Sequence, residues 1–147
     1  MKIILQRVKE ASCKVSEEVI STIEHGYLLL VGFKKGDTVK EALFLAKKVA
    51  KLRIYEDAQG KLNHDILSQK NYQILSISQF TIYGDTKKGN RPSFTEAMAP
   101  DEANELYNKF NQALRELGLI VKEGKFQHHM DISLINDGPV TIILEKD

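Results

Sequence analysis

KIILQRVKEASCKVSEEVISTIEHGYLLLVGF, residues 2–33, consists of short apolar or alternating runs interrupted by polar segments. The runs cover residues 2–8, 11–15, 19–23 and 27–33, and SEE (16–18) and EHG (24–26) lie between the later ones. Alternation with a period of two is typical of half-buried strands, and clusters of serine, glycine and charged residues are typical of turns. Strands joined by such short turns pair antiparallel, so this stretch predicts the start of an antiparallel sheet.

The apolar period then changes from two to that of a helix. In DTVKEALFLAKKVAKL (37–52), Thr38 and Glu41 match a capping box, in which the two side chains bind the free amides of the first turn. The residues expected to share its buried face are Val39, Ala42, Leu43, Ala46 and Ala50.

A second helix is predicted from Pro100 to just before Gly118, because proline suits the first helical position and glycine the position after the end. Its expected apolar stripe is Ala103, Leu106, Tyr107, Phe110, Ala113, Leu114 and Leu117. Further strands are predicted at RIYED (53–57), Tyr72 to Tyr83, DISLI (131–135) and VTIILEKD (140–147). Without repeats or linkers, residues 1–147 are expected to form a single α+β domain, with a mostly antiparallel, β-barrel-like sheet and two principal helices.

Composition restricts the functions that the chain can have. Its 147 residues, 42% of them hydrophobic, suit one compact domain. No run approaches the ~20 apolar residues of a membrane span, and the first residues lack a signal-peptide cleavage site, so a cytoplasmic protein is expected. The net charge of +1 argues against binding nucleic acid through bulk charge. Cys13 is the only cysteine, which excludes an internal disulfide and is read as a packed thiol.

The stretch SISQFTIYGDTKKGNRPSF (76–94) places polar side chains in a strand-like run and continues into a basic loop. In a regular strand Ser78 and Phe80 point to one face and Gln79 and Thr81 to the other, so the four cannot line one pocket from a continuous strand. If the segment is functional, a site is expected at its end, where the strand breaks at Gly84 and backbone amides become free. The residue types alone favour the alternative, that Ser78 and Thr81 bond only to neighbouring backbone in a half-buried strand.

Two further features allow more than one interpretation. Lys87, Lys88 and Arg91 lie close together on the loop and suit contacts to phosphate or RNA, although such charges are often only solvated. In NDGPVT (136–141), Pro139 makes a simple two-residue hairpin unfavourable; for the Gly138–Pro139 bond the residues alone favour trans, with cis as the alternative.

Several familiar sites are excluded by spacing. No nucleophile elbow surrounds Ser78, and no phosphate-binding glycine motif includes Gly84 and Gly89, so neither ATP nor NAD is expected. The four histidines show neither triad nor metal-ligand spacing, so we expect no metal and no cofactor; they are His25, His64, His128 and His129.

Taken together, these motifs resemble the D-aminoacyl-tRNA deacylase family, which includes the D-tyrosyl-tRNA deacylases. The resemblance covers essentially the whole chain and is carried by LQRV (5–8), VGFKKGDT (31–38), LRIYED (52–57), SQFTIYGD (78–85), KKGNRPSF (87–94) and NDGPVT (136–141). Two sets of residues depart from the family pattern: Gln127, His128 and His129, and Asn90 at a position that is often basic.

The resemblance implies an esterase that releases a D-amino acid from the 3′-terminal adenosine of tRNA, as a proofreading step, without a cofactor. It implies a homodimer in which Gly138 and Pro139, joined by a cis bond, reach the partner's pocket and exclude L-amino acids through main-chain atoms. Ser78, Gln79, Phe80 and Thr81 would line the adenosine and ester side. Arg7 would fix the Gly-Pro segment.

What remains open is the chemistry and whether turnover occurs. Because glycine has no side chain to exclude, glycyl-tRNA is also expected to be hydrolysed. The ester is attacked either with help from the ribose 2′-hydroxyl or by Thr81 as nucleophile. Two other readings are a non-catalytic RNA-binding barrel that uses Lys87, Lys88 and Arg91, and a structural dimerisation module.

Overall fold

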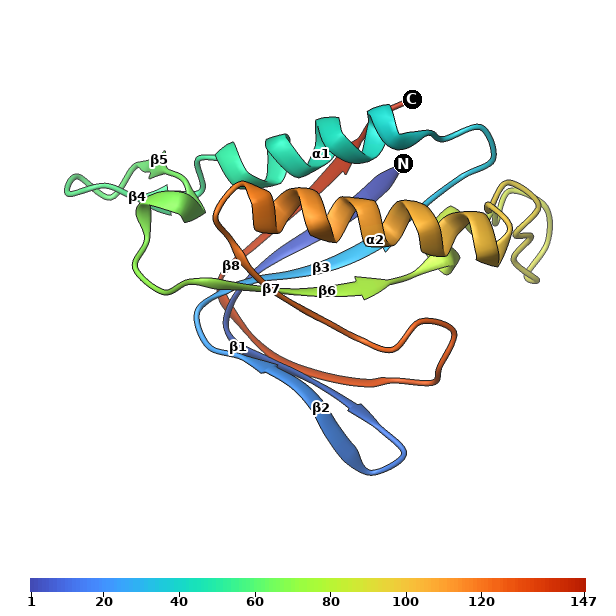
Figure 1. Cartoon of the computed structure of the whole chain (residues 1–147), viewed down its shortest axis with the longest axis horizontal. Helices are drawn as coiled ribbons and strands as arrows, with labels where there is room; N and C mark the ends of the chain where they lie inside the picture. The colour runs from blue at the N-terminus through green and yellow to red at the C-terminus, as the bar shows by residue number, and fades with distance from the viewer.

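The computed structural model describes residues 1–147. Its strands are β1 (Lys2–Val15), β2 (Glu18–Ile23), β3 (Gly26–Gly32), β4 (Tyr55–Glu56), β5 (Leu62–His64), β6 (Gln73–Ser78), β7 (Ile120–Glu123) and β8 (Asp131–Glu145). Its helices are α1 (Val39–Lys51) and α2 (Pro100–Glu116), with 3₁₀ turns η1 (Ile66–Ser68) and η2 (Phe80–Tyr83). The two helices lie side by side over one face of the sheet (Figure 1).

The main sheet is organised around the long strand β1. Strand β8 pairs with one edge of β1, while β3 pairs with residues 2–8 and β2 with residues 11–15, all antiparallel. Strands β6 and β7 extend the sheet from β3 in parallel. The Ser21 hydroxyl donates to the Glu123 carbonyl at 2.5 Å, so β2 approaches β7 and the sheet is nearly closed.

The expected α+β fold with a barrel-like sheet and two principal helices is confirmed, although the sheet is mixed. The chain reaches β6 after crossing through α1, and it reaches β7 after crossing through α2. Such long crossovers return a strand in the same direction as its neighbour, which is why these two pairings are parallel. Strand β7 was not predicted, because four residues carry too little pattern.

Helix α1 begins as predicted, and Ala42, Ala46 and Ala50 are buried as expected, but the buried face is shifted around the helix. Thr38 and Glu41 form the capping box: the Thr38 amide donates to Glu41 Oε2 at 2.7 Å, and the Lys40 amide donates to Thr38 Oγ1 at 3.2 Å. Val39 and Leu43, expected in the core, are 38% and 44% exposed. The buried residues are Ala42, Leu45, Ala46, Val49 and Ala50. Neither helix is both long and apolar enough to cross a membrane.

Strand β6 ends earlier than predicted. The sequence suggested a strand to Tyr83, but the ladder stops after Ser78 and residues 80–83 form the turn η2. The Gln79 amide makes the last bond to the neighbouring strand, to the Val31 carbonyl at 2.8 Å. Because β3 ends one residue later at Gly32, the chain beyond Gln79 has no strand to pair with.

Strand β8 is continuous through the predicted turn, with a bulge. Gln6 on β1 pairs with Thr141 and Val8 pairs with Asn136, so residues 137–140 loop out opposite Arg7. The Gly138–Pro139 peptide is cis, so the trans preference from the residues alone was wrong.

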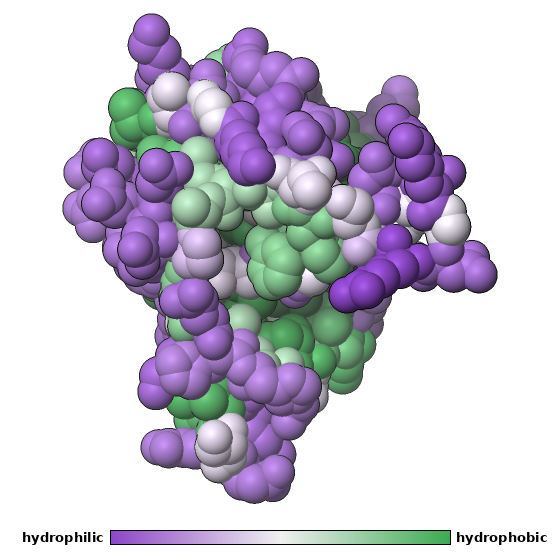
Figure 2. Space-filling model, turned by 90° about the vertical axis from the view of Figure 1, so that its right-hand side faces the viewer, coloured by the Kyte–Doolittle hydropathy of each residue, from purple (hydrophilic) through white to green (hydrophobic).

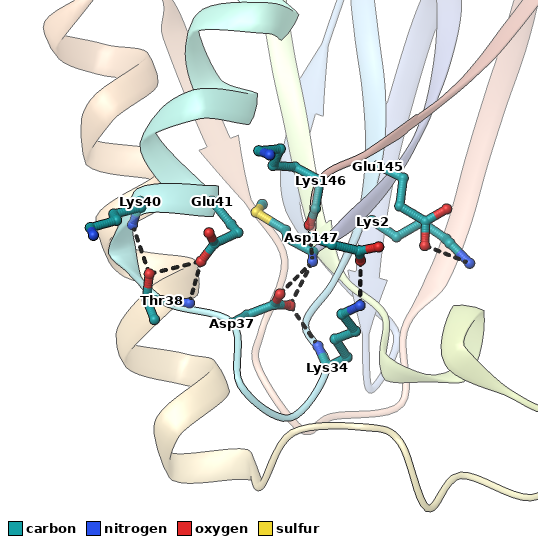
Figure 3. A network of polar contacts seen from close by, with 10 residues as sticks. Lys2, Lys34, Asp37, Thr38, Lys40, Glu41, Glu145, Lys146 and Asp147 are labelled. Carbon is teal, nitrogen blue, oxygen red and sulfur yellow. Dashed lines mark hydrogen bonds and ion pairs between the residues drawn. The ribbon is translucent and has the colours of Figure 1, made fainter.

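The two ends of the chain meet beside the start of α1 (Figure 3). The buried Met1 ammonium donates to Asp37 Oδ1 at 2.7 Å and to the Lys146 carbonyl at 2.9 Å. The Lys34 amide donates to Asp37 Oδ2 at 2.8 Å, and its ammonium pairs with Asp147. These bonds hold the loop 33–38 against the ends of β1 and β8.

Candidate functional site

A cavity of about 750 Å³ opens where β3 and β6 end. Four segments enclose it: the strand ends, the residues before and at the start of α2, Phe94 on the basic loop, and residues 126–130 between β7 and β8. Figure 2 shows this face, where apolar side chains gather at the centre and hydrophilic ones surround them. Such a surface suits a ligand with an apolar or aromatic part and a polar part.

The polar strand end forms one wall of the cavity. Ser78 and Gln79 are half-buried, and Phe80 is 56% exposed with its ring edge against Phe94, the ring centroids 5.2 Å apart. All four residues line the cavity. The break from strand to η2 also leaves the Phe80 and Thr81 amides in the first turn, where helical geometry provides no partner.

Thr81 lies beside the cavity but does not line it. Its hydroxyl accepts a hydrogen bond from the Gln79 side-chain amide. An amide is not a base at neutral pH, so this contact orients the hydroxyl without activating it.

Helix α2 anchors the end of strand β6 through a hydrogen bond. The Tyr107 hydroxyl donates to the Ser76 carbonyl at 2.7 Å, and the Gly124 amide donates to the same oxygen at 3.0 Å. Burial raises the pKa of Tyr107 to about 12, so the hydroxyl keeps its proton and remains a donor. The position of the polar wall is therefore fixed two residues before Ser78.

Arg7 braces the bulge of β8 from inside. It is 3% exposed, and its guanidinium donates to the Asp137 carbonyl at 3.1 Å, to the Ile54 carbonyl at 2.5 Å and to both oxygens of Glu56 at 3.1 Å. The hydrogen bond from Arg7 lowers the pKa of Glu56.

Gly138 and Pro139, which follow in the bulge, are exposed. Neither lines the cavity of its own chain.

The basic loop is closed by an antiparallel bridge at its base. The amides and carbonyls of Asp85 and Ser93 bond to each other at 2.8 and 2.9 Å. Lys87, Lys88 and Arg91 are exposed on the loop and do not line the cavity, whereas Phe94, just after the bridge, does. The three cations therefore lie on the same loop as a wall residue.

The opposite wall contains residues that sequence reasoning left without a role. Gln127, His128 and His129 are exposed on the rim, and Gln127 has the left-handed φ of 60°. His128 Nδ1 lies 2.9 Å from the Phe126 carbonyl, and His129 Nε2 lies 3.4 Å from Asp131 Oδ1. No three His, Cys, Asp or Glu side chains are grouped so as to hold a metal ion.

Other wall residues were missed because they carry no polar chemistry. Phe126 and Met98 drew no interpretation from the sequence, although both line the cavity. Gly32 offered a weak signal, as a glycine at the end of an apolar run. A Cβ there would lie 2.9 Å from the Gln79 carbonyl, so only glycine lets β3 approach the polar wall this closely.

Comparisons with known proteins agree with one another. The family model described as D-Tyr-tRNA(Tyr) deacylase matches residues 4–145. A protein named D-aminoacyl-tRNA deacylase from Exiguobacterium sp. is 56% identical over 100% of this chain and 99% of its own, and one from Bacillus mycoides is 53% identical over 99% of each. A solved structure described as c-Myc DNA Unwinding Element Binding Protein superposes with a TM-score of 0.91 at 41% identity, over 100% of this chain and 99% of the other. A second, described as a probable eukaryotic D-amino acid tRNA deacylase, has a TM-score of 0.82 at 16% identity over 97% of each chain and shares the fold.

Proposed function

The chain belongs to the D-Tyr-tRNA(Tyr) deacylase family, and on that basis we propose that it hydrolyses the ester between a D-amino acid and the 3′-terminal adenosine of tRNA. The observation that carries the proposal is the wall of Ser78, Gln79 and Phe80 at the edge of a cavity whose lining is mostly apolar. Charged tRNA is present in the cytoplasm, where we expect the protein to act.

The cavity suits both parts of this substrate. The exposed rings of Phe80 and Phe94 offer surfaces on which a base can stack. The Phe80 and Thr81 amides, at the start of η2, are in a position to donate to the oxyanion that develops when the ester carbonyl is attacked. Both donors belong to the main chain, so they are held in place before the substrate arrives.

Attack by water with help from the ribose 2′-hydroxyl is the route we favour. The side-chain partner of the Thr81 hydroxyl is Gln79, which cannot accept its proton. A threonine without a base is a weak nucleophile. The substrate's own hydroxyl is next to the ester and needs no further positioning.

We propose that the active form is a homodimer and that Gly138 and Pro139 act in the partner's cavity. Within one chain both residues are exposed and lie away from the cavity lining. Strand β8 pairs only with β1, and Ile135 and Ile143 on it are 51% and 64% exposed, which suits a surface covered by a second copy. Main-chain atoms of the Gly-Pro segment then block the direction of an L side chain without contacting the D side chain.

Hydrolysis of D-tyrosyl-tRNA and L-tyrosyl-tRNA by the purified protein tests the activity. We expect loss of the D ester with time, a much slower loss of the L ester, and some hydrolysis of glycyl-tRNA. Retention of tRNA without loss of ester would instead support a non-catalytic RNA-binding protein. A dimerisation module would show neither.

Two further comparisons separate the chemical routes. Thr81→Ala should keep most of the activity, and a D-aminoacyl-tRNA ending in 2′-deoxyadenosine should be a poor substrate. Full activity on the deoxy substrate, together with an inactive Thr81→Ala variant, would make Thr81 the nucleophile.

A further inference from the structure

Helix α1 carries a row of lysines on its outer side. Lys47 and Lys51 follow Lys40 by seven and eleven residues, which places both within about 20° of Lys40 around the helix axis. All three are exposed, and Lys48 lies beside the row and is also exposed. With a length of about 20 Å, the helix presents these charges as one line rather than as scattered residues.

Local helix chemistry does not explain this row. No ion pair within the chain involves Lys40, Lys47 or Lys51. Lys51 in the last turn suits the helix dipole, but Lys40 in the first turn opposes it, and Lys47 and Lys51 repel each other at i,i+4. Figure 3 shows the Lys40 side chain directed away from the nearby carboxylates. A polyanionic partner would offset these unfavourable contributions by attracting each of the three ammonium groups.

The neighbouring helix α2 has the opposite character. Its exposed polar side chains are Asp101, Glu102, Glu105, Asn108, Lys109, Gln112, Arg115 and Glu116, with four acids against two bases. On the outer side of the helix layer, a polyanion is therefore attracted to α1 and repelled by α2.

The row begins next to the cavity. The Met98 amide donates to the Phe33 carbonyl at 3.1 Å, and the Lys35 amide donates to the Glu96 carbonyl at 2.9 Å. These bonds join the loop before α1 to Met98, which lines the cavity, and to Glu96 just before the lining segment 97–100. From there α1 runs away from the cavity end of the molecule (Figure 1).

We propose that Lys40, Lys47 and Lys51 bind the phosphate backbone of the double-helical acceptor stem of tRNA while the 3′ end of the same molecule occupies the cavity. This inference rests on the proposed function for the identity of the RNA. The occupant is a duplex because a straight row of about 16 Å follows a regular backbone, whereas the single-stranded end is already placed in the cavity. Phosphate contacts of this kind position a nucleic acid without reading its sequence.

The test compares two triple variants with the same change in charge. Lys40→Gln, Lys47→Gln and Lys51→Gln together remove the row, and glutamine keeps the helix propensity of lysine. The control changes three exposed lysines elsewhere, none of them in an ion pair, to glutamine: Lys61, Lys70 and Lys109. Binding is measured with an uncharged acceptor-stem hairpin ending in CCA and with the CCA trinucleotide alone.

We expect the row variant to bind the hairpin more than about 40-fold more weakly at 50 mM salt and to bind the trinucleotide like the unmodified protein. Three lost phosphate contacts reduce the slope of log affinity against log salt by about 2.7. Between 50 and 200 mM salt, the affinity of the unmodified protein should therefore fall about 40-fold more than that of the row variant. The control variant should retain both the affinity and the slope.

Equal hairpin binding by the row variant and the unmodified protein would overturn the proposal. A change in the mass of the dimer in the row variant would also overturn it, because the row would then belong to the dimer interface. The same holds if the row variant loses binding to anionic phospholipid vesicles while its hairpin binding is unchanged. Because uncharged RNA is used, a protein that bound the hairpin through the row but never hydrolysed D-aminoacyl ester would contradict only the proposed function.

Discussion

Replacement of Arg7 by methionine tests whether the bulge of β8 is held by this one side chain. Methionine retains most of the apolar length but none of the five N–H donors. It leaves the Ile54 and Asp137 carbonyls without their side-chain donor and Glu56 without its ion pair. The stack of the guanidinium over the Tyr55 ring, at 5.5 Å, is lost as well.

The magnitude follows from the burial of each partner. Each carbonyl left without a donor costs about 1–3 kcal/mol, the larger value applying to the buried Ile54 oxygen. The pair with Glu56, which is 48% exposed, adds little because solvent screens it. We therefore expect the free energy of unfolding to fall by about 4 kcal/mol, or roughly 8–16 °C in Tm for a chain of this size.

Urea unfolding followed by circular dichroism measures the change, and D-tyrosyl-tRNA hydrolysis is measured in parallel where the variant remains folded. The matched control is Arg53→Met, because Arg53 is exposed and bonds only to Asn63. It should lose less than about 1 kcal/mol. If Arg7→Met unfolds within about 0.5 kcal/mol of the unmodified protein and keeps full activity, the bulge is held by something other than Arg7.

Three further outcomes follow from individual contacts. Gly26→Ala places a Cβ 1.7 Å from a backbone carbonyl oxygen of β6 and should lower the free energy of unfolding by about 3 kcal/mol or more. In the control Gly60→Ala the added Cβ meets no atom within 4 Å, so the loss should be only about 1–2 kcal/mol. Equal losses for the two variants in urea unfolding would contradict this. Burial raises the pKa of the Cys13 thiol, so iodoacetamide should alkylate the folded protein much more slowly than the urea-unfolded protein. Similar alkylation rates for the two forms near pH 8 would argue against a buried thiol. Because the pKa of Glu56 is lowered from 4.5 on folding, its pair with Arg7 stabilises the protein above pH 4.5, and this stabilisation is lost as the pH falls below that value. In Glu56→Gln, the free energy of unfolding in urea should therefore fall less steeply as the pH is lowered. The same decrease below pH 4.5 in the variant and the unmodified protein would refute this.

The elements with strong local patterns were predictable. The capping box at Thr38 and Glu41 and the proline start of α2 depend on residues close together in the sequence, and both formed where expected. The alternating first runs also formed strands, although residues 2–8 and 11–15 belong to the one continuous strand β1. Errors occurred where a distant strand decides the outcome. Strand β6 stops at Ser78 because its partner β3 ends, and Val39 on α1 is exposed because the sheet and α2 select which face is buried.

The candidate site shows the same division. Its polar wall could be located from the sequence, since Ser78 and Gln79 interrupt an apolar run. The opposite wall could not, because Phe126 and Met98 look like any core residue until the fold brings them to the cavity.

Residue order alone determined the short-range features of this protein: the switch from strand to helix periods, the caps, and the family motifs. Only the tertiary structure decided where strands end, which helix face is buried, and that Arg7 lies opposite residues 137–140. The physical reason is that hydrogen-bond ladders and buried faces need a partner, and these partners lie far away along the chain. For Gly138 and Pro139 we propose that the partner belongs to a second copy.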